Sequence, residues 1–92
     1  MYFERTKFLI VGMSGSGRAA CRLLLGYNAK VAIFDENPSV EVKKTMKSLE
    51  ESGAVVVGND GINAAVGNAD VIVLSPGVPV DNKIPALAAE KG

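Results

Sequence analysis

Four short apolar runs alternate along the chain with segments that have helical spacing. Continuous apolar runs of this length are typical of strands that are buried on both faces of a parallel sheet. The runs cover Lys7–Val11, Lys30–Asp35, Ala54–Val57 and Asp70–Ser75. Because strand and helix alternate throughout, the pattern predicts an α/β fold.

The segments between these runs carry the start and stop signals of helices. Asn28 and Gly53 stand where the first two helices should end, because both residue types favour the left-handed backbone of a helix terminus. Helices are predicted over Ser16–Gly26, over 38–51, over a short stretch after 59–61 that ends near Gly67, and over Lys83–Lys91. Four apolar residues recur at helical spacing in the first helix and are expected to form its buried face: Ala20, Leu23, Leu24 and Tyr27.

The order of these elements predicts a Rossmann-like, doubly wound parallel sheet. Right-handed crossovers would give the strand order 3-2-1-4. The chain reaches Gly92 where such folds normally continue into a fifth strand, so we expect that this last strand is missing. Residues 1–92 would then form a single domain, the N-terminal domain of a longer protein.

Composition narrows the possible functions. Lys and Arg number 10, and Asp and Glu also number 10, so the net charge is zero. That balance gives no electrostatic footprint for nucleic acid or for an anionic membrane. No apolar run approaches the roughly 20 residues that span a bilayer, so a cytoplasmic protein is expected. Cys21 is the single cysteine and the chain has no histidine, which favours a buried thiol over a catalytic nucleophile.

A loop rich in glycine and serine follows the first strand. Gly12 permits a sharp exit from the strand, and Gly15 and Gly17 let backbone amides approach a ligand. The next helix directs free amides and the positive end of its dipole to the same place, which suits phosphate oxygens. Ser14 and Ser16 add hydroxyl donors. The loop therefore predicts a phosphate site; the alternative is that Ser16 only caps the helix and the glycines only pack it on the sheet.

This loop matches the dinucleotide fingerprint G-x-G-x-x-G only in part. Gly12 and Gly17 fit its first and last glycines, but Ser14 takes the middle place. Asp35, at the end of the second strand, can accept from ribose hydroxyls or from the N–H of a base. The alternative for Asp35 is a solvated acid at a strand end, which applies still more to Glu36. A nicotinamide- or flavin-dependent oxidoreductase and a regulatory nucleotide-binding module therefore both stay open.

A second unusual loop follows the fourth strand. Pro76 ends the strand because it has no N–H to donate, and Gly77 is expected to take a positive φ. Ser75 would present its hydroxyl beside them. With the strand order 3-2-1-4, this loop faces the glycine loop across the crevice where the strand order reverses, which is where such sheets bind ligands. An ordinary surface loop is the alternative on chemistry alone.

Three stretches together resemble a known family. They are FLIVGMSGSGRAACRLLL, KVAIFDENP and ADVIVLSPGVPVDNKIPALAAEKG, and they are similar to the N-terminal domain of the Mur ligases, most of all the members that add D-glutamate. The resemblance covers essentially the whole chain. It implies a three-domain enzyme of bacterial peptidoglycan synthesis whose first domain holds the UDP part of UDP-N-acetylmuramoyl-L-alanine. The central domain would bind ATP and Mg²⁺, and the C-terminal domain would bring in D-glutamate.

The resemblance also implies which residues bind substrate. The loop 14–17 would receive the UDP diphosphate, Asp35 would contact the uracil, and the loop 75–77 would lie beside the nucleotide sugar. The implied UDP-sugar-binding residues are Ser14, Gly15, Ser16, Gly17, Asp35, Glu36, Ser75, Pro76 and Gly77. No catalytic or metal-binding residue is implied in this chain.

Two departures from the family pattern stand out. Ser14 replaces a glycine that is common in the family's loop, and Glu36 and Asn37 stand where some members offer a small polar and a basic residue to the base. The chain also lacks the G-K-[ST] ending of a P-loop. We therefore expect ATP and Mg²⁺ to bind elsewhere in the full-length enzyme, and we expect this chain alone to catalyse nothing.

Overall fold

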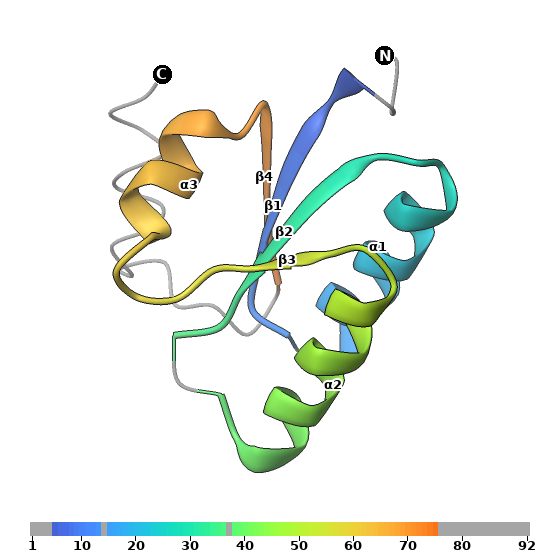
Figure 1. Cartoon of the computed structure of the whole chain (residues 1–92), viewed down its shortest axis with the longest axis vertical. Coiled ribbons are helices and arrows are strands. Elements are labelled where there is room, and N and C mark those ends of the chain that lie inside the picture. The colour runs from blue at the N-terminus through green and yellow to red at the C-terminus, as the bar shows by residue number, and fades with distance from the viewer. Residues whose placement is uncertain (1–4, 14, 37, 76–92) are drawn as a thin grey trace.

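The protein forms a parallel four-stranded sheet with helices on both faces (Figure 1). A computed structural model describes residues 5–13, 15–36 and 38–75. The elements are β1 (Lys7–Val11), α1 (Gly15–Gly26), β2 (Lys30–Phe34), α2 (Val40–Glu51), β3 (Val55–Val56), α3 (Ile62–Asn68) and β4 (Val71–Leu74). The strand order is β3-β2-β1-β4, so the predicted Rossmann-like topology is confirmed.

The alternation of side chains along the strands separates two apolar cores. Ile10 and Ile33 face α1 and α2, while Leu9 and Phe34 face α3. All four side chains are buried, which explains why the strands read as continuous apolar runs and not as alternating ones. In Figure 1, α1 and α2 lie on one side of the sheet and α3 on the other.

The predicted helix ends are confirmed by the backbone. Asn28, just after α1, has a φ of 61°, and Gly53, just after α2, has a φ of 117°. Both residues therefore adopt the left-handed conformation that turns the chain back towards the next strand. At the start of α2, the Ser39 hydroxyl accepts a hydrogen bond from the Val42 amide at 3.2 Å, which is the usual bond of a serine N-cap.

The predicted buried face of α1 is confirmed for Leu24 and for the partly buried Ala20, but it is wrong for Leu23 and Tyr27. The buried residues are Gly17, Cys21 and Leu24, whereas Leu23 is 61% exposed and Tyr27 is 54% exposed. The cause is the short connection from β1, which brings the first turn of α1 very close to the sheet. Small residues must therefore face the sheet at that end of the helix. The buried face of α1 consequently follows Gly17, Cys21 and Leu24 and does not include the large side chains of Leu23 and Tyr27.

β1 has the predicted bounds, and the other three strands are slightly shorter than predicted. Asp35, Asp70 and Ser75 lie just outside their strands, although the Ser75 amide still donates to the Val11 carbonyl at 2.9 Å. The third strand is confined to Val55–Val56. The predicted helix at Lys83–Lys91, and the strand expected beyond it, fall outside the described residues. Within the part of the chain that is described, no helix is long and apolar enough to cross a membrane.

Candidate functional site

The carboxyl ends of the strands bring the two unusual loops together. The chain moves outward from β1 to β2 and β3 and then returns to β4 on the other side of β1. The strand order therefore reverses between β1 and β4, and a crevice outside the sheet is expected at that point. The glycine loop leaves β1 at this place, and Ser75 leaves β4 beside it.

Gly12 connects three strands at this edge. Its φ of 92° is a conformation that residues with a side chain rarely adopt. Its amide donates to the Phe34 carbonyl at the end of β2, at 2.8 Å. Its carbonyl accepts from the Ser75 hydroxyl at the end of β4, at 2.7 Å. The start of the glycine loop is thus held from both neighbouring strands.

Gly17 packs directly against this arrangement. A Cβ atom built on Gly17 would overlap the Gly12 carbonyl oxygen and would lie 2.7 Å from the Ser75 Oγ. Gly17 therefore lets α1 approach the ends of β1 and β4, which is the role of the last glycine in the dinucleotide fingerprint. We call Gly12, Gly17 and Ser75 the loop junction.

Gly15 and Ser16 occupy a different environment. Both are exposed in the first turn of α1, where backbone amides have no partner within the helix. Among the described residues, a Cβ built on Gly15 would meet only an Arg18 side-chain nitrogen, at 4.0 Å. The helix begins at Gly15, so Ser16 lies inside the first turn and the alternative of Ser16 as the N-cap is not supported. Ser14 lies outside the described residues.

Asp35 ties the glycine loop to the end of β2. Its Oδ2 accepts a hydrogen bond from the Met13 amide at 3.0 Å. The Met13 side chain, only 1% exposed, anchors the same loop in the core under α1. Asp35 itself is half-buried and Glu36 is exposed. Asp35 thus combines a fixed position with access to the edge of the sheet.

A cleft of about 430 Å³ opens next to Asp35, between α2 and the ends of β2 and β3. We call it the α2 cleft. Its lining comprises Asp35, Pro38, Lys43, Met46, Lys47, Glu50, Val56, Val57, Gly58 and Asn59. It therefore combines an apolar wall with carboxylate, ammonium and amide groups, which is the usual character of a small-molecule site.

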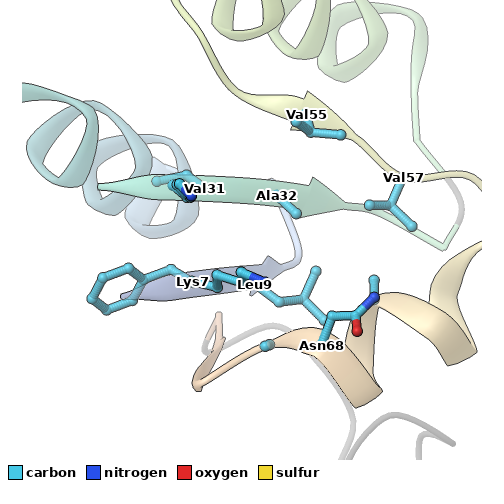
Figure 2. Close-up of a pocket in the computed structure, with 11 residues that line it drawn as sticks. Lys7, Leu9, Val31, Ala32, Val55, Val57 and Asn68 are labelled. Carbon is cyan, nitrogen blue, oxygen red and sulfur yellow. The ribbon is translucent and has the colours of Figure 1, made fainter. Parts of the chain in front are cut away.

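A second hollow lies beside α3 on the opposite face of the sheet. Figure 2 shows Leu9, Ala32, Val55 and Val57 along the sheet with Asn68 of α3 across from them. Its volume is about 250 Å³ and its lining is largely apolar. Since the hollow has few groups that could orient a polar substrate, we place the candidate site at the α2 cleft and the glycine loop.

Cys21 takes no part in this site. Its side chain is fully buried in α1 against the sheet. Burial raises the pKa of the Cys21 thiol above its ordinary value, although the charge of Arg22 acts in the opposite direction. A thiol in this environment stays protonated and is a poor nucleophile. Among the described residues, no group of three His, Cys, Asp or Glu side chains could hold a metal ion.

The structure brings most of the predicted residues to one edge. Gly15, Ser16, Gly17, Asp35, Glu36 and Ser75 all lie at the carboxyl ends of the strands. Ser75 differs from the expectation in one respect, because it is 5% exposed and its hydroxyl hydrogen is directed to Gly12. Pro76 and Gly77 lie outside the described residues.

Sequence reasoning missed two features of this edge. One is the Met13 amide, whose bond to Asp35 joins positions far apart in the sequence. The other is the pair of lysines on α2, Lys43 and Lys47. Their spacing of four residues puts them on one face of a helix that starts shortly after Asp35, and that signal is present in the sequence.

Comparison with known proteins decides the family. A family model described as "Mur ligase MurD-like, N-terminal domain" matches residues 6–92. The chain belongs to this family.

Two curated members of the family are UDP-N-acetylmuramoylalanine–D-glutamate ligases. The one from Chromobacterium violaceum is 40% identical over 97% of the chain and 19% of its own length. The one from Geobacillus kaustophilus is 35% identical over 99% of the chain and 20% of its own length. The chain therefore spans about a fifth of these Mur ligase relatives.

Solved structures that resemble this Mur ligase domain include dehydrogenases. An L-alanine dehydrogenase superposes with a TM-score of 0.68 and 31% identity, covering 94% of the chain and 25% of the dehydrogenase. A D-lactate dehydrogenase from Aquifex aeolicus, complexed with NAD and lactic acid, has a TM-score of 0.61 and 20% identity, covering 80% of the chain and 19% of the dehydrogenase. These likenesses agree with the Rossmann-like fold, which many unrelated activities share.

Proposed function

We propose that this chain is the substrate-nucleotide domain of an ATP-dependent ligase that joins D-glutamate to UDP-N-acetylmuramoyl-L-alanine in peptidoglycan synthesis. The observation that carries the proposal is the match to the D-glutamate ligase family over residues 6–92. The geometry supports it, because the glycine loop meets Ser75 at the switch point of the sheet, where α/β proteins bind nucleotides.

Each part of the edge has a role in holding the UDP group. Gly15 and Ser16 are exposed residues at the positive end of the α1 dipole, and their backbone amides would donate to the diphosphate oxygens. Asp35, fixed by the Met13 amide, would accept from the N3–H of uracil. Ser75 and the loop after it would lie beside the sugar. Ser14 and Glu36 would complete the same surface, and the buried Gly17 would contribute by setting the position of the first turn of α1.

The remaining functions would belong to the rest of the enzyme. The sequence has no G-K-[ST] loop for ATP, and the described residues offer no cluster for Mg²⁺. As the resemblance to the Mur ligases implies, we assign ATP, Mg²⁺ and D-glutamate to the central and C-terminal domains of the full-length protein. We also propose that the enzyme acts in the bacterial cytoplasm.

An NMR titration of the 92-residue chain, in which backbone amide chemical shifts are monitored, tests this proposal. UDP-N-acetylmuramoyl-L-alanine should perturb the amides of Gly15, Ser16, Asp35 and Ser75 in a saturable manner, because these residues would surround the UDP group. NAD at the same concentration should leave them unchanged. Perturbation by NAD alone would favour an oxidoreductase domain, and no response to either ligand would contradict the proposed site.

A further inference from the structure

The two faces of the sheet are covered unequally. Both α1 and α2, each of 12 residues, pack on one face, whereas of the described helices only the seven-residue α3 lies on the other (Figure 1). One helix is about 10 Å across and strands lie about 4.8 Å apart, so a single helix covers about two strands. The rest of this face holds the hollow of about 250 Å³, which we call the α3 hollow. Its lining contains none of the proposed UDP-binding residues.

The floor of the α3 hollow is apolar because of the alternation along the strands. Ala32 of β2 is paired with Leu9 of β1 on one side and with Val55 of β3 on the other, so the three form a row across the sheet. Figure 2 shows Asn68 of α3 across the hollow from this row. The small side chains of Ala32 and Ala65 leave the space open, and Val55 is 62% exposed. An apolar group placed here would therefore be removed from water, which is favourable.

Two lysines border the α3 hollow at the amino ends of the strands. Lys7 and Lys30 are directly paired in the ladder and both line the hollow. They precede Leu9 and Ala32 by two residues, so the alternation directs them to the same face. Within the described residues neither ammonium forms an ion pair, and Asp70 instead accepts from the Lys7 backbone amide at 2.9 Å. Like charges at paired positions of a sheet repel each other, and an anion between them would relieve the repulsion.

The apolar floor and the lysine pair together specify one kind of ligand. They are continuous, because the lysine pair and the pair Leu9 and Ala32 are consecutive on this face. A carboxylate only accepts hydrogen bonds, and its two oxygens match two ammonium donors. The volume is slightly below the roughly 300 Å³ at which pockets for drug-sized ligands begin, so the ligand is small. We propose that the α3 hollow binds a small carboxylate with an apolar tail. The carboxylate lies between Lys7 and Lys30, and the tail follows the floor towards Val57.

An NMR titration of the 92-residue chain with octanoate tests this proposal. Octanoate should shift the backbone amides of Leu9, Ala32 and Ala65 in a saturable manner and should leave those of Gly15 and Ser16 unchanged. Acetate has the charge without the tail, and 1-octanol has the tail without the charge. Each should bind at least about tenfold more weakly than octanoate, because each makes only one of the two contacts.

Three variants locate the binding site. Lys30→Gln should lower the octanoate affinity about fivefold, because one of the two ammonium donors is removed. The matched control Lys44→Gln removes an exposed ammonium from α2, on the other face of the sheet, and should keep the affinity. Ala65→Leu should lower the affinity at least about tenfold, because the larger side chain occupies the hollow. Far-ultraviolet circular dichroism checks that each variant is folded.

Several results would overturn the proposal. No response to octanoate, or equal binding of octanoate and 1-octanol, would remove the role of the lysine pair. Equal losses in Lys30→Gln and Lys44→Gln would indicate a general effect of charge. Shifts at Gly15 and Ser16 in place of the α3 hollow would assign octanoate to the proposed UDP site. A spectrum that changes with protein concentration, and not with octanoate, would make the hollow a contact between two copies of the chain. The titration with UDP-N-acetylmuramoyl-L-alanine tests the proposed function separately.

Discussion

The two halves of the carboxyl edge are built in opposite ways. In the loop junction, Gly12, Gly17 and Ser75 are so close that a single added carbon would collide with backbone. The α2 cleft, beside the ends of β2 and β3, leaves about 430 Å³ open and is bordered by charged side chains. One half of the edge is filled by the protein itself, and the other has room for a ligand.

The difference shows how a Rossmann-like loop divides its tasks between neighbouring residues. The loop junction uses its polar atoms internally, since the Ser75 hydroxyl bonds to the Gly12 carbonyl. It therefore sets the position of the first turn of α1. Gly15 and Ser16, only one or two residues before Gly17, remain exposed and keep their amides at the open side. Packing and ligand binding can thus be changed separately.

Gly17→Ala should have the largest effect and should act on stability. Its Cβ would overlap the Gly12 carbonyl, and neither atom can move without shifting α1 or β1. We expect a loss of about 3 kcal/mol in the free energy of unfolding, measured by urea denaturation. The matched control is Gly15→Ala, which has open space and should change stability by less than about 1 kcal/mol. Equal effects of the two substitutions would remove the distinction between packing and binding glycines.

Ser75→Ala should have an intermediate effect on stability. The substitution removes the donor to the Gly12 carbonyl at a site where Ser75 is only 5% exposed. A loss of about 1–2 kcal/mol is expected in the same denaturation experiment, because a poorly solvated carbonyl loses its partner. Ser52→Ala serves as the control, since it removes a similar bond to the Ser48 carbonyl, at 3.3 Å, on an exposed surface. If Ser52→Ala costs as much as Ser75→Ala, the loop junction has no special rigidity.

Gly15→Ala should have the smallest effect, confined to binding. Its added methyl group would stand in the space where we place the diphosphate, so UDP affinity should fall about fivefold while the fold is kept. Gly26→Ala, at the other end of α1 and also in open space, should leave UDP affinity unchanged. Chemical-shift titrations measure both. Unaltered UDP binding by Gly15→Ala would indicate that the diphosphate lies elsewhere.

The arrangement of the strands could be predicted because it depends on local signals. Each apolar run is bounded by turn residues, and Asn28 and Gly53 have the backbone conformation that their types suggested. Once four strands alternate with helices, handedness leaves few topologies. The position of Asp35 and the loops at one edge followed from the strand order alone.

The details of the site could not be predicted because they depend on distances between segments. From the sequence, both Gly15 and Gly17 were expected to let backbone amides approach a ligand, but only the proximity of Gly12 and Ser75 shows that Gly17 is a packing residue. Because Gly17 packs so closely on Gly12 and Ser75, the face of α1 that carries Gly17 is turned to the sheet. Leu23 therefore faces solvent, contrary to the prediction. The bond from Met13 to Asp35 likewise joins two segments that have no common pattern in the sequence.

The loop junction also constrains how this domain can vary in evolution. The two atoms that close the space around Gly17 differ in kind, since one is a side-chain oxygen of Ser75 and the other is the backbone carbonyl of Gly12. Replacement of Ser75 can remove the first, but no substitution removes a carbonyl. Position 75 is therefore free to exchange its serine for another small donor. Position 17 is closed to every residue with a side chain for as long as the backbone of the loop keeps its path.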